Sequence, residues 1–412
     1  MKDEEYQNSD FLATKRALFF TDILSEPLKV LYNSLVLALL CRYFHASLLQ
    51  ITLFTTLKPV LSLFSFYWSF WFKKSPHLLV KKTLITELLA RVPFFIIPFT
   101  SNTWVAILCF ASYMTFSQGV KPAWVELLKR NIAPEKRAFL FSLSSGVSFL
   151  LGTVLGLSFG ILLDKHQEVW RILLPSCALI SCIGIFFQSK IPEKTSEQSV
   201  TSLPSVREIF IQPWKESLLL LSQRPDFRFF QYLFMLAGSS LMLLIPVTPI
   251  LYTQTLNLSY TEIAVAIALF KGLGFALSST SWSHILHRKG LFFTIQSVFF
   301  IIGLYPLFLL FTFIHPSSIF LACFIYGIGQ AGSRLSWTLS GSFFAQDEES
   351  NRFTEINIVS IALRGAIMPS IGSLLLFYAN PITVCLTSLL LCWGAALLSY
   401  NNQSLHIFKK TS

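Results

Sequence analysis

The sequence has few charged residues, and it lacks the motifs of soluble enzymes. Of its 412 residues, 13% are Asp, Glu, Lys or Arg, about half the share in a typical soluble domain. It contains no P-loop or HExxH motif. Its 7 histidines are scattered, so we expect no metal cluster. The chain is therefore expected not to be an enzyme and to need no cofactor.

The cysteines likewise form no recognisable site. All lie in apolar runs, none forms a CxxC pair, and their number, 7, is odd. A disulfide framework or a cysteine metal site is therefore not expected. We interpret these residues as small packing side chains: Cys41, Cys109, Cys177, Cys182, Cys323, Cys385 and Cys392.

What the sequence has instead is a series of long hydrophobic runs, and 53% of its residues are hydrophobic. Each run has about 18–27 residues, the length needed to cross a hydrocarbon layer about 30 Å thick with some tilt. The sequence thus predicts an all-α integral membrane protein with about twelve transmembrane helices. The expected spans are 22–44, 47–72, 82–100, 103–124, 139–163, 171–189, 229–253, 258–283, 291–313, 317–340, 354–378 and 382–400.

The distribution of basic residues between the loops predicts the orientation in the membrane. Loops on one side contain clusters such as Lys73–Lys74, Lys129–Arg130 and Arg288–Lys289, whereas loops on the other side contain few basic residues. By the positive-inside rule the basic side is cytoplasmic, so both termini are expected there. This rule also accounts for the net charge of +11 without nucleic-acid binding. We expect a multi-pass protein of the bacterial inner (plasma) membrane.

One long polar loop divides the spans into two groups. The expected organisation is a cytoplasmic tail at 1–21, a six-helix bundle at 22–189, a cytoplasmic linker at 190–228, a second six-helix bundle at 229–400 and a tail at 401–412. Within the linker, residues 206–221 have the pattern of an amphipathic helix lying on the bilayer surface.

Local patterns repeat between the two groups of spans. Lys58 is followed by Trp68-Ser69 and a basic cluster, and Lys271 is followed by Trp282-Ser283 and a basic cluster. Near the end of the fourth and tenth spans, a basic residue (Lys121 or Arg334) precedes a Trp by three positions, with Gln upstream. Such matches indicate two parallel structural repeats.

Three further stretches bear a family resemblance. They are Ala133-Pro-Glu-Lys-Arg-Ala138, the glycines of the following span (Gly146, Gly152, Gly156 and Gly160), and Arg364-Gly-Ala-Ile-Met-Pro-Ser-Ile-Gly372. With the six-plus-six layout, they make nearly the whole chain resemble the major facilitator superfamily. The resemblance implies two pseudo-symmetric six-helix bundles and a secondary transporter that works by alternating access. Thr115 stands where that family commonly has the Arg linked to proton coupling.

Charged residues at bilayer depth are the first candidates for function, because each costs a few kcal/mol or more to bury. Lys58 and Lys271 lie near mid-membrane in the second and eighth spans. If they face one central cavity, their ammonium groups repel each other, and a bound anion would relieve that repulsion. They could equally be structural, each pairing with a nearby carboxylate or carbonyl.

The remaining candidates have structural alternatives as well. Glu87 and Arg91 share one helix face, so a structural ion pair is favoured over a gating or proton site. Lys121 and Arg334 could form a cytoplasmic anion vestibule or reach the lipid headgroups. The other substrate-binding candidates could instead hold helices together: Glu26, Asn33, Gln118, Gln330 and Arg364.

The most specific hypothesis is a secondary transporter of a small solute, with an organic anion as the favoured class. The alternative is a transporter-like receptor or assembly factor without transport activity. The expected partners are the lipid bilayer and a small-molecule substrate, with no nucleic acid, and we expect a monomer. Coupling to a proton or another ion stays open.

Overall fold

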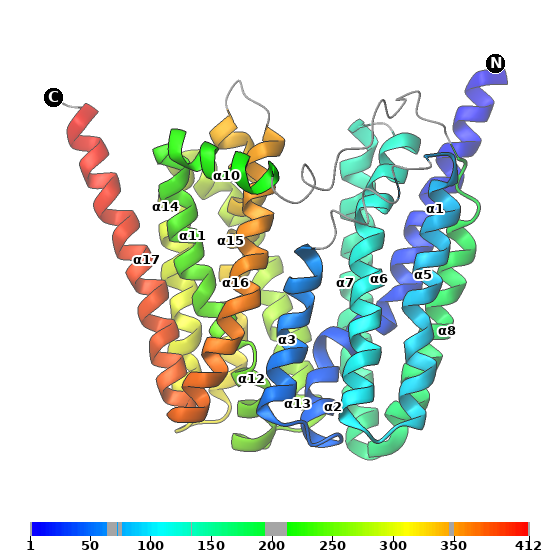
Figure 1. The fold of residues 1–412 in the computed structure, drawn as a ribbon, viewed down its shortest axis with the longest axis horizontal. Coiled ribbons are helices and arrows are strands. Elements are labelled where there is room, and N and C mark those ends of the chain that lie inside the picture. The colour runs from blue at the N-terminus through cyan, green and yellow to red at the C-terminus, as the bar shows by residue number, and fades with distance from the viewer. Residues whose placement is uncertain are drawn as a thin grey trace. The chain divides into compact units, whose positions relative to one another are not determined.

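The computed structural model describes residues 2–63, 72, 76–132, 134–193, 212–345 and 350–410. Within these residues all regular secondary structure is helical (Figure 1). Six of the described helices are long and apolar enough to cross a membrane: Phe11–Arg42, Trp170–Gln188, Pro225–Thr255, Tyr260–Phe311, Ile356–Tyr378 and Pro381–Tyr400. An α-helix satisfies its own backbone hydrogen bonds, which is why it can cross a bilayer.

The first half of the chain opens with a helix that is longer than the sequence indicated. α1 begins at Lys2, so residues 2–21, expected as a tail, are helical. Charged residues do not prevent helix formation, because they change the solvation of the helix and not its backbone bonding. The elements are α1 (Lys2–Val30), η1 (Leu31–Leu35), α2 (Val36–Arg42), α3 (Leu48–Leu63), η2 (Pro76–Leu78), α5 (Leu79–Ile96), η3 (Ile97–Phe99), α6 (Thr103–Asn131), α7 (Pro134–Lys165), η4 (Gln167–Val169) and α8 (Trp170–Gln188).

In the second half, α14 (Lys271–Phe311) includes parts of two expected spans. It consists of two helical segments separated at Gly290, whose φ of 76° and ψ of 176° are non-helical. A positive φ of this kind is accessible to glycine at little cost. The elements are α10 (Gln212–Gln223), α11 (Pro225–Leu244), α12 (Val247–Ile250), η5 (Leu251–Thr255), α13 (Tyr260–Ala264), η6 (Val265–Phe270), α14 (Lys271–Phe311), α15 (Ser318–Ala345), α16 (Ser350–Tyr378) and α17 (Pro381–Lys410).

The chain divides into two compact units. The N-terminal unit contains Met1–Ser202 and Leu258–Ala264, and the C-terminal unit contains Leu203–Asn257 and Val265–Ser412. The short segment Leu258–Ala264 is held in the N-terminal unit by Asp164, whose carboxylate oxygens accept from the backbone N–H groups of Tyr260 at 2.7 Å and Thr261 at 2.8 Å. α10 falls within the expected cytoplasmic linker, and residues 194–211 of that linker lie outside the described residues.

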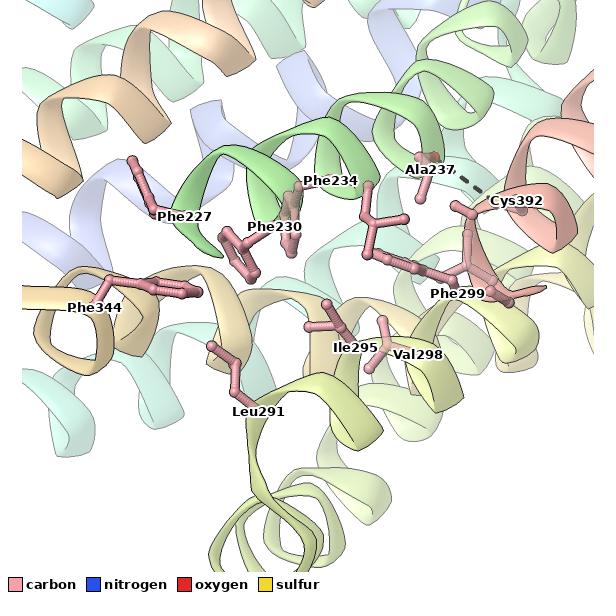
Figure 2. Close-up of a cluster of buried hydrophobic side chains, with 14 of the residues drawn as sticks. Phe227, Phe230, Phe234, Ala237, Leu291, Ile295, Val298, Phe299, Phe344 and Cys392 are labelled. Atoms are coloured by element: carbon pink, nitrogen blue, oxygen red, sulfur yellow. Dashed lines mark hydrogen bonds between the residues drawn. The ribbon is translucent and has the colours of Figure 1, made fainter. Parts of the chain in front are cut away.

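Phenylalanine side chains form the core of the C-terminal unit. Phe227, Phe230 and Phe234 follow one face of α11 at spacings of three and four residues, and Figure 2 shows them beside Phe344 and Phe299. Phe344 lies 5.1 Å, between ring centroids, from both Phe227 and Phe230. In a bilayer, lipid tails are as apolar as these rings, so close packing and not exclusion of water holds such a cluster together.

Glycines bring helices of the C-terminal unit into backbone contact. A Cβ built on Gly274 of α14 would overlap the carbonyl oxygen of Phe324 in α15, and one on Gly327 would overlap that of Lys271. Likewise, a Cβ on Gly372 of α16 would overlap the carbonyl oxygen of Leu243 in α11. Small residues at these crossings let the backbones approach closely, as is common between membrane helices.

Candidate functional site

A cavity of about 400 Å³ lies inside the N-terminal unit. Its wall is formed by side chains from α1, η1, α3, α5, α6 and α8. Charged, amide, hydroxyl and aromatic groups all contribute to it. The lining residues are Thr21, Asp22, Ser25, Leu28, Lys29, Tyr32, Asn33, Lys58, Glu87, Arg91, Tyr113, Met114, Ser117, Gln118, Val120, Trp124 and Ser181.

Helix α1 presents a group of three charges beside the cavity. Asp22, Glu26 and Lys29 are spaced by four and three residues, which places them on one helix face. The Lys29 ammonium lies 3.5 Å from an Asp22 carboxylate oxygen and 3.7 Å from one of Glu26. Asp22 also accepts a hydrogen bond of 2.5 Å from the Ser144 hydroxyl of α7. Two carboxylates therefore share one ammonium group.

Helix α5 adds a buried ion pair to the cavity. Arg91 and Glu87 form a salt bridge one turn apart, and their side chains are 8% and 13% exposed. The Arg91 Nε donates to the Ser181 hydroxyl at 3.1 Å, and that hydroxyl donates to Ser25 at 3.1 Å. A buried arginine whose charge is matched and hydrogen-bonded in this way is held rigidly. Both residues also line the cavity.

The wall between these charges is aromatic and amide-bearing. The π-helical turn η1 interrupts the first span and carries Tyr32 and Asn33 into the lining. Such turns often occur at functional sites because the extra residue re-aims neighbouring side chains. The Tyr32 ring meets that of Tyr113 edge-on, with centroids 4.9 Å apart. From α6, the buried Gln118 adds a second amide to the lining.

Lys58 of α3 is the candidate from the second span that reaches this cavity. Its side chain is exposed to the surrounding space, and it forms part of the cavity lining. It lies on a different helix from Lys29 and Arg91, so three helices each contribute a cation to one cavity. The cavity is thus a mixed-charge site rich in hydrogen-bond donors.

Lys271 lies in the C-terminal unit, where an aromatic ring contacts it. It is the first residue of α14, directly after the π-helical segment η6. Its ammonium lies 4.7 Å from the ring centroid of Tyr326, which stacks on Tyr305 with centroids 4.7 Å apart. A cation over a ring face is stabilised by about 0.5–2 kcal/mol. No carboxylate among the described residues forms an ion pair with Lys271.

Arg364 of α16 is a deeply buried cation of the C-terminal unit, with 8% of its surface exposed. Its Nη1 donates to the Phe234 carbonyl of α11 at 2.6 Å. Arg334 of α15 is exposed, and its guanidinium lies 6.0 Å from the ring centroid of Phe275. Gln330 is half-buried on the same helix, and the side chain of Lys121 lies outside the described part of the chain.

Five of the residues proposed from the sequence therefore line the cavity: Asn33, Lys58, Glu87, Arg91 and Gln118. Glu26 lies beside it through its ion pair with Lys29. The sequence reasoning missed Asp22, Tyr32, Tyr113 and Ser181. For Asp22 a signal existed, namely its spacing of four and seven residues from Glu26 and Lys29.

These groups are hydrogen-bond donors and acceptors. Among the described residues, no group of three His, Cys, Asp or Glu side chains is close enough to hold a metal ion. The arrangement is suited to holding a small polar molecule with charged groups, because charges of both signs and several donors converge on one cavity.

Comparison with known proteins places the fold. The family model described as Major Facilitator Superfamily matches residues 28–369. Among solved structures, a mutant of the nucleoside transporter NupG has a TM-score of 0.70 at 13% identity, covering 95% of this chain and 99% of that one. No curated protein sequence matches the chain.

Two other solved transporters show the same fold. A POT family transporter in complex with 5-aminolevulinic acid has a TM-score of 0.68 at 11% identity, covering 95% of each chain. A bacterial homologue of the iron transporter ferroportin has a TM-score of 0.64 at 15% identity, covering 95% of this chain and 97% of that one. At these identities the likeness concerns the fold, a twelve-helix transporter architecture.

Proposed function

Since the chain belongs to the major facilitator superfamily, we propose that it is a secondary transporter that carries a small organic anion by alternating access. Transport by this mechanism needs a binding site near mid-membrane that each side of the membrane can reach in turn. The mixed-charge cavity is the proposed anion-binding region of the N-terminal unit. Lys271 and Arg364 are the proposed anion-binding residues of the C-terminal unit.

The excess of positive charge in the second half is the observation that carries the anion proposal. Neither 227–257, nor 265–345, nor 356–400 contains an Asp or a Glu. The same ranges contain Lys271 and Arg364 within membrane-spanning helices. A cation in a bilayer needs a partner to offset its lost hydration. A negatively charged substrate would supply that partner for as long as it is bound.

The N-terminal cavity supports the same class of substrate. Its cations Lys29 and Arg91 are matched by the carboxylates of Asp22, Glu26 and Glu87. Lys58 adds a further ammonium to the lining, and Asn33, Gln118 and Tyr113 add neutral polar groups. A ligand with one or two negative groups on a polar body would fit such a cavity, because fixed polar groups orient it while aromatic rings cover it.

The proposed transporter lies in the inner membrane of a bacterium, with both termini in the cytoplasm. The basic clusters near helix ends and breaks, including Lys81–Lys82 at the start of α5 and Arg288–Lys289 before Gly290, support this orientation by the positive-inside rule. Labelling of single cysteines introduced at these positions, compared in intact cells and in inverted vesicles, measures the orientation directly.

Binding of anions to the purified protein tests the substrate class. A ligand that binds only the folded state raises the thermal unfolding midpoint. We expect an anion from a library of anionic, neutral and cationic metabolites to stabilise the wild type and to be taken up by proteoliposomes. In the double variant Lys58→Gln/Lys271→Gln we expect the stabilisation to disappear and uptake of that anion to fall at least about tenfold.

A matched control removes two other positive charges, one from each half of the chain. Lys81 and Arg288 are both exposed, one in each half of the chain. The variant Lys81→Gln/Arg288→Gln should bind and transport as the wild type does. If neutral or cationic compounds alone stabilise the protein, the anion class is wrong. An anion that binds without any flux would favour the receptor alternative.

A further inference from the structure

The buried guanidinium of Arg364 has an incomplete set of partners. Its Nη1 donates to the carbonyl oxygen of Phe234 at 2.6 Å. Its Nε is enclosed by protein and has no hydrogen-bond partner among the described residues. No hydrogen bond from Nη2 to a described residue is formed either. An arginine has five N–H donors, and a buried donor without an acceptor costs about 1–3 kcal/mol.

Arg364 also lacks a carboxylate to match its charge. The ion pairs among the described residues do not include it, and residues 227–257, 265–345 and 356–400 contain no Asp or Glu. Arg91, the buried arginine of the other unit, is by contrast paired with Glu87. An arginine used only to pack helices could be replaced by an apolar residue of similar size without this cost.

Gly238 of α11 fixes the place of the guanidinium. A Cβ built on Gly238 would overlap the Nη1 and Cζ atoms of Arg364 and would also come too close to its Nε atom, so this side of the guanidinium rests on the glycine. The guanidinium therefore fills the space that any larger residue at position 238 would occupy. With Nη1 held by Phe234 and the group resting on Gly238, the Nε and Nη2 edge is left without an acceptor in the described part of the chain.

We propose that Arg364 binds two oxygens of the head group of the transported anion, a carboxylate or a phosphate, through its Nε and Nη2 atoms. These two donors point in parallel, which is the geometry that binds two oxygens of one anion at once. The proposal rests on the proposed function and adds the chemistry of the head group. Because only 8% of the residue is exposed, the anion reaches the Nε edge through a movement of the surrounding side chains.

Two substitutions keep the positive charge at position 364 but disturb the paired Nε and Nη2 donors, and a third removes both. Arg364→Lys keeps a positive charge but loses the paired donors, so the dissociation constant should rise about tenfold. Gly238→Ala leaves Arg364 in the sequence and displaces its guanidinium, so it should weaken binding in the same way. Arg364→Met replaces the buried charge with an apolar side chain of similar length, which is expected to fold and to lose binding altogether.

The probes are succinate and inorganic phosphate, each measured against chloride at equal ionic strength and against the neutral compound succinamide. The readout is the thermal unfolding midpoint of the purified full-length protein. We expect succinate or phosphate to stabilise the wild type and the control Arg288→Lys, whose side chain is exposed two residues before the break of α14 at Gly290. Stabilisation by succinate alone identifies a carboxylate, and stabilisation by phosphate alone identifies a phosphate ester or phosphate.

The proposal is overturned if neither anion stabilises the wild type, or if Arg364→Met binds as tightly as the wild type does. Uptake into proteoliposomes distinguishes a failure of the Arg364 site from a failure of the proposed anion transport. Anion uptake that depends on Lys58 and Lys271 but is unchanged in Arg364→Met would leave anion transport intact and remove Arg364 from the site. Absence of any anion uptake would instead remove the proposed function.

Discussion

The two units bury charge in opposite ways. In the N-terminal unit Arg91 is paired with Glu87, and Lys29 lies between Asp22 and Glu26. In the C-terminal unit Lys271 has an aromatic ring and Arg364 has one carbonyl oxygen. The first unit therefore pairs Lys29 and Arg91 with its own carboxylates, whereas the second offers Lys271 and Arg364 only neutral partners among the described residues.

This difference distinguishes cations that are already neutralised by a carboxylate from cations that could still attract an anionic ligand. A matched and hydrogen-bonded ion pair keeps its geometry and has little attraction left for a ligand. A cation held only by a ring or a carbonyl gains most from an added anion, since nothing nearby has cancelled its charge. By this reasoning Lys271 and Arg364 are expected to gain more from an added anion than Lys29 and Arg91 are.

The largest expected effect comes from removing the carboxylate partner of Arg91, which leaves Arg91 paired with no carboxylate, as Arg364 is among the described residues. Glu87→Ala leaves the 8% exposed Arg91 side chain without its carboxylate, and breaking a buried ion pair in this way costs about 3–5 kcal/mol. We expect a large fall in the thermal unfolding midpoint of purified protein. The double variant Glu87→Leu/Arg91→Met, in which both charges are absent, should recover most of that loss.

If Glu87→Ala does not lower the thermal unfolding midpoint, the comparison between the buried arginines of the two units fails. It would mean that a buried arginine without a carboxylate is tolerated in either unit, so that the missing acid beside Arg364 would no longer point to a ligand. The same midpoint measurement therefore tests the reasoning behind the anion site as well as the ion pair itself.

A second contrast concerns two helix crossings, one in each unit. At the crossing of α11 and α16 a Cβ on Gly372 would overlap the carbonyl oxygen of Leu243, whereas at the crossing of α1 and α8 one on Gly184 would lie 3.4 Å from its nearest neighbour, Thr21 Cα. Gly372→Ala should therefore cost about 1–3 kcal/mol by forcing α11 and α16 apart. Gly184→Ala, the matched control, should change the unfolding midpoint little, and equal losses in both would contradict the contrast.

The helices could be predicted from the sequence because an apolar run of some twenty residues is too long for most strands and core helices and matches the bilayer thickness. Lys58, Glu87 and Arg91 could be singled out because a charge in a hydrophobic run is costly wherever it points. Tyr32 and Tyr113 could not, since the chain has 12 tyrosines and 41 phenylalanines, and composition does not tell cavity-lining rings from lipid-facing ones. The role of Gly238 becomes visible only with the position of Arg364, 126 residues later in the chain.

The smallest expected effect is that of Glu26→Gln. Asp22 still lies 3.5 Å from the Lys29 ammonium after this change and still accepts from Ser144, so the cation keeps a carboxylate. Removing one of two neighbouring anions also relieves their mutual repulsion. We expect the free energy of unfolding to change by less than about 1 kcal/mol, in contrast to Glu87→Ala. A loss as large as that of Glu87→Ala, measured under the same conditions, would show that Lys29 requires both carboxylates and that this group is as tightly matched as the Glu87–Arg91 pair.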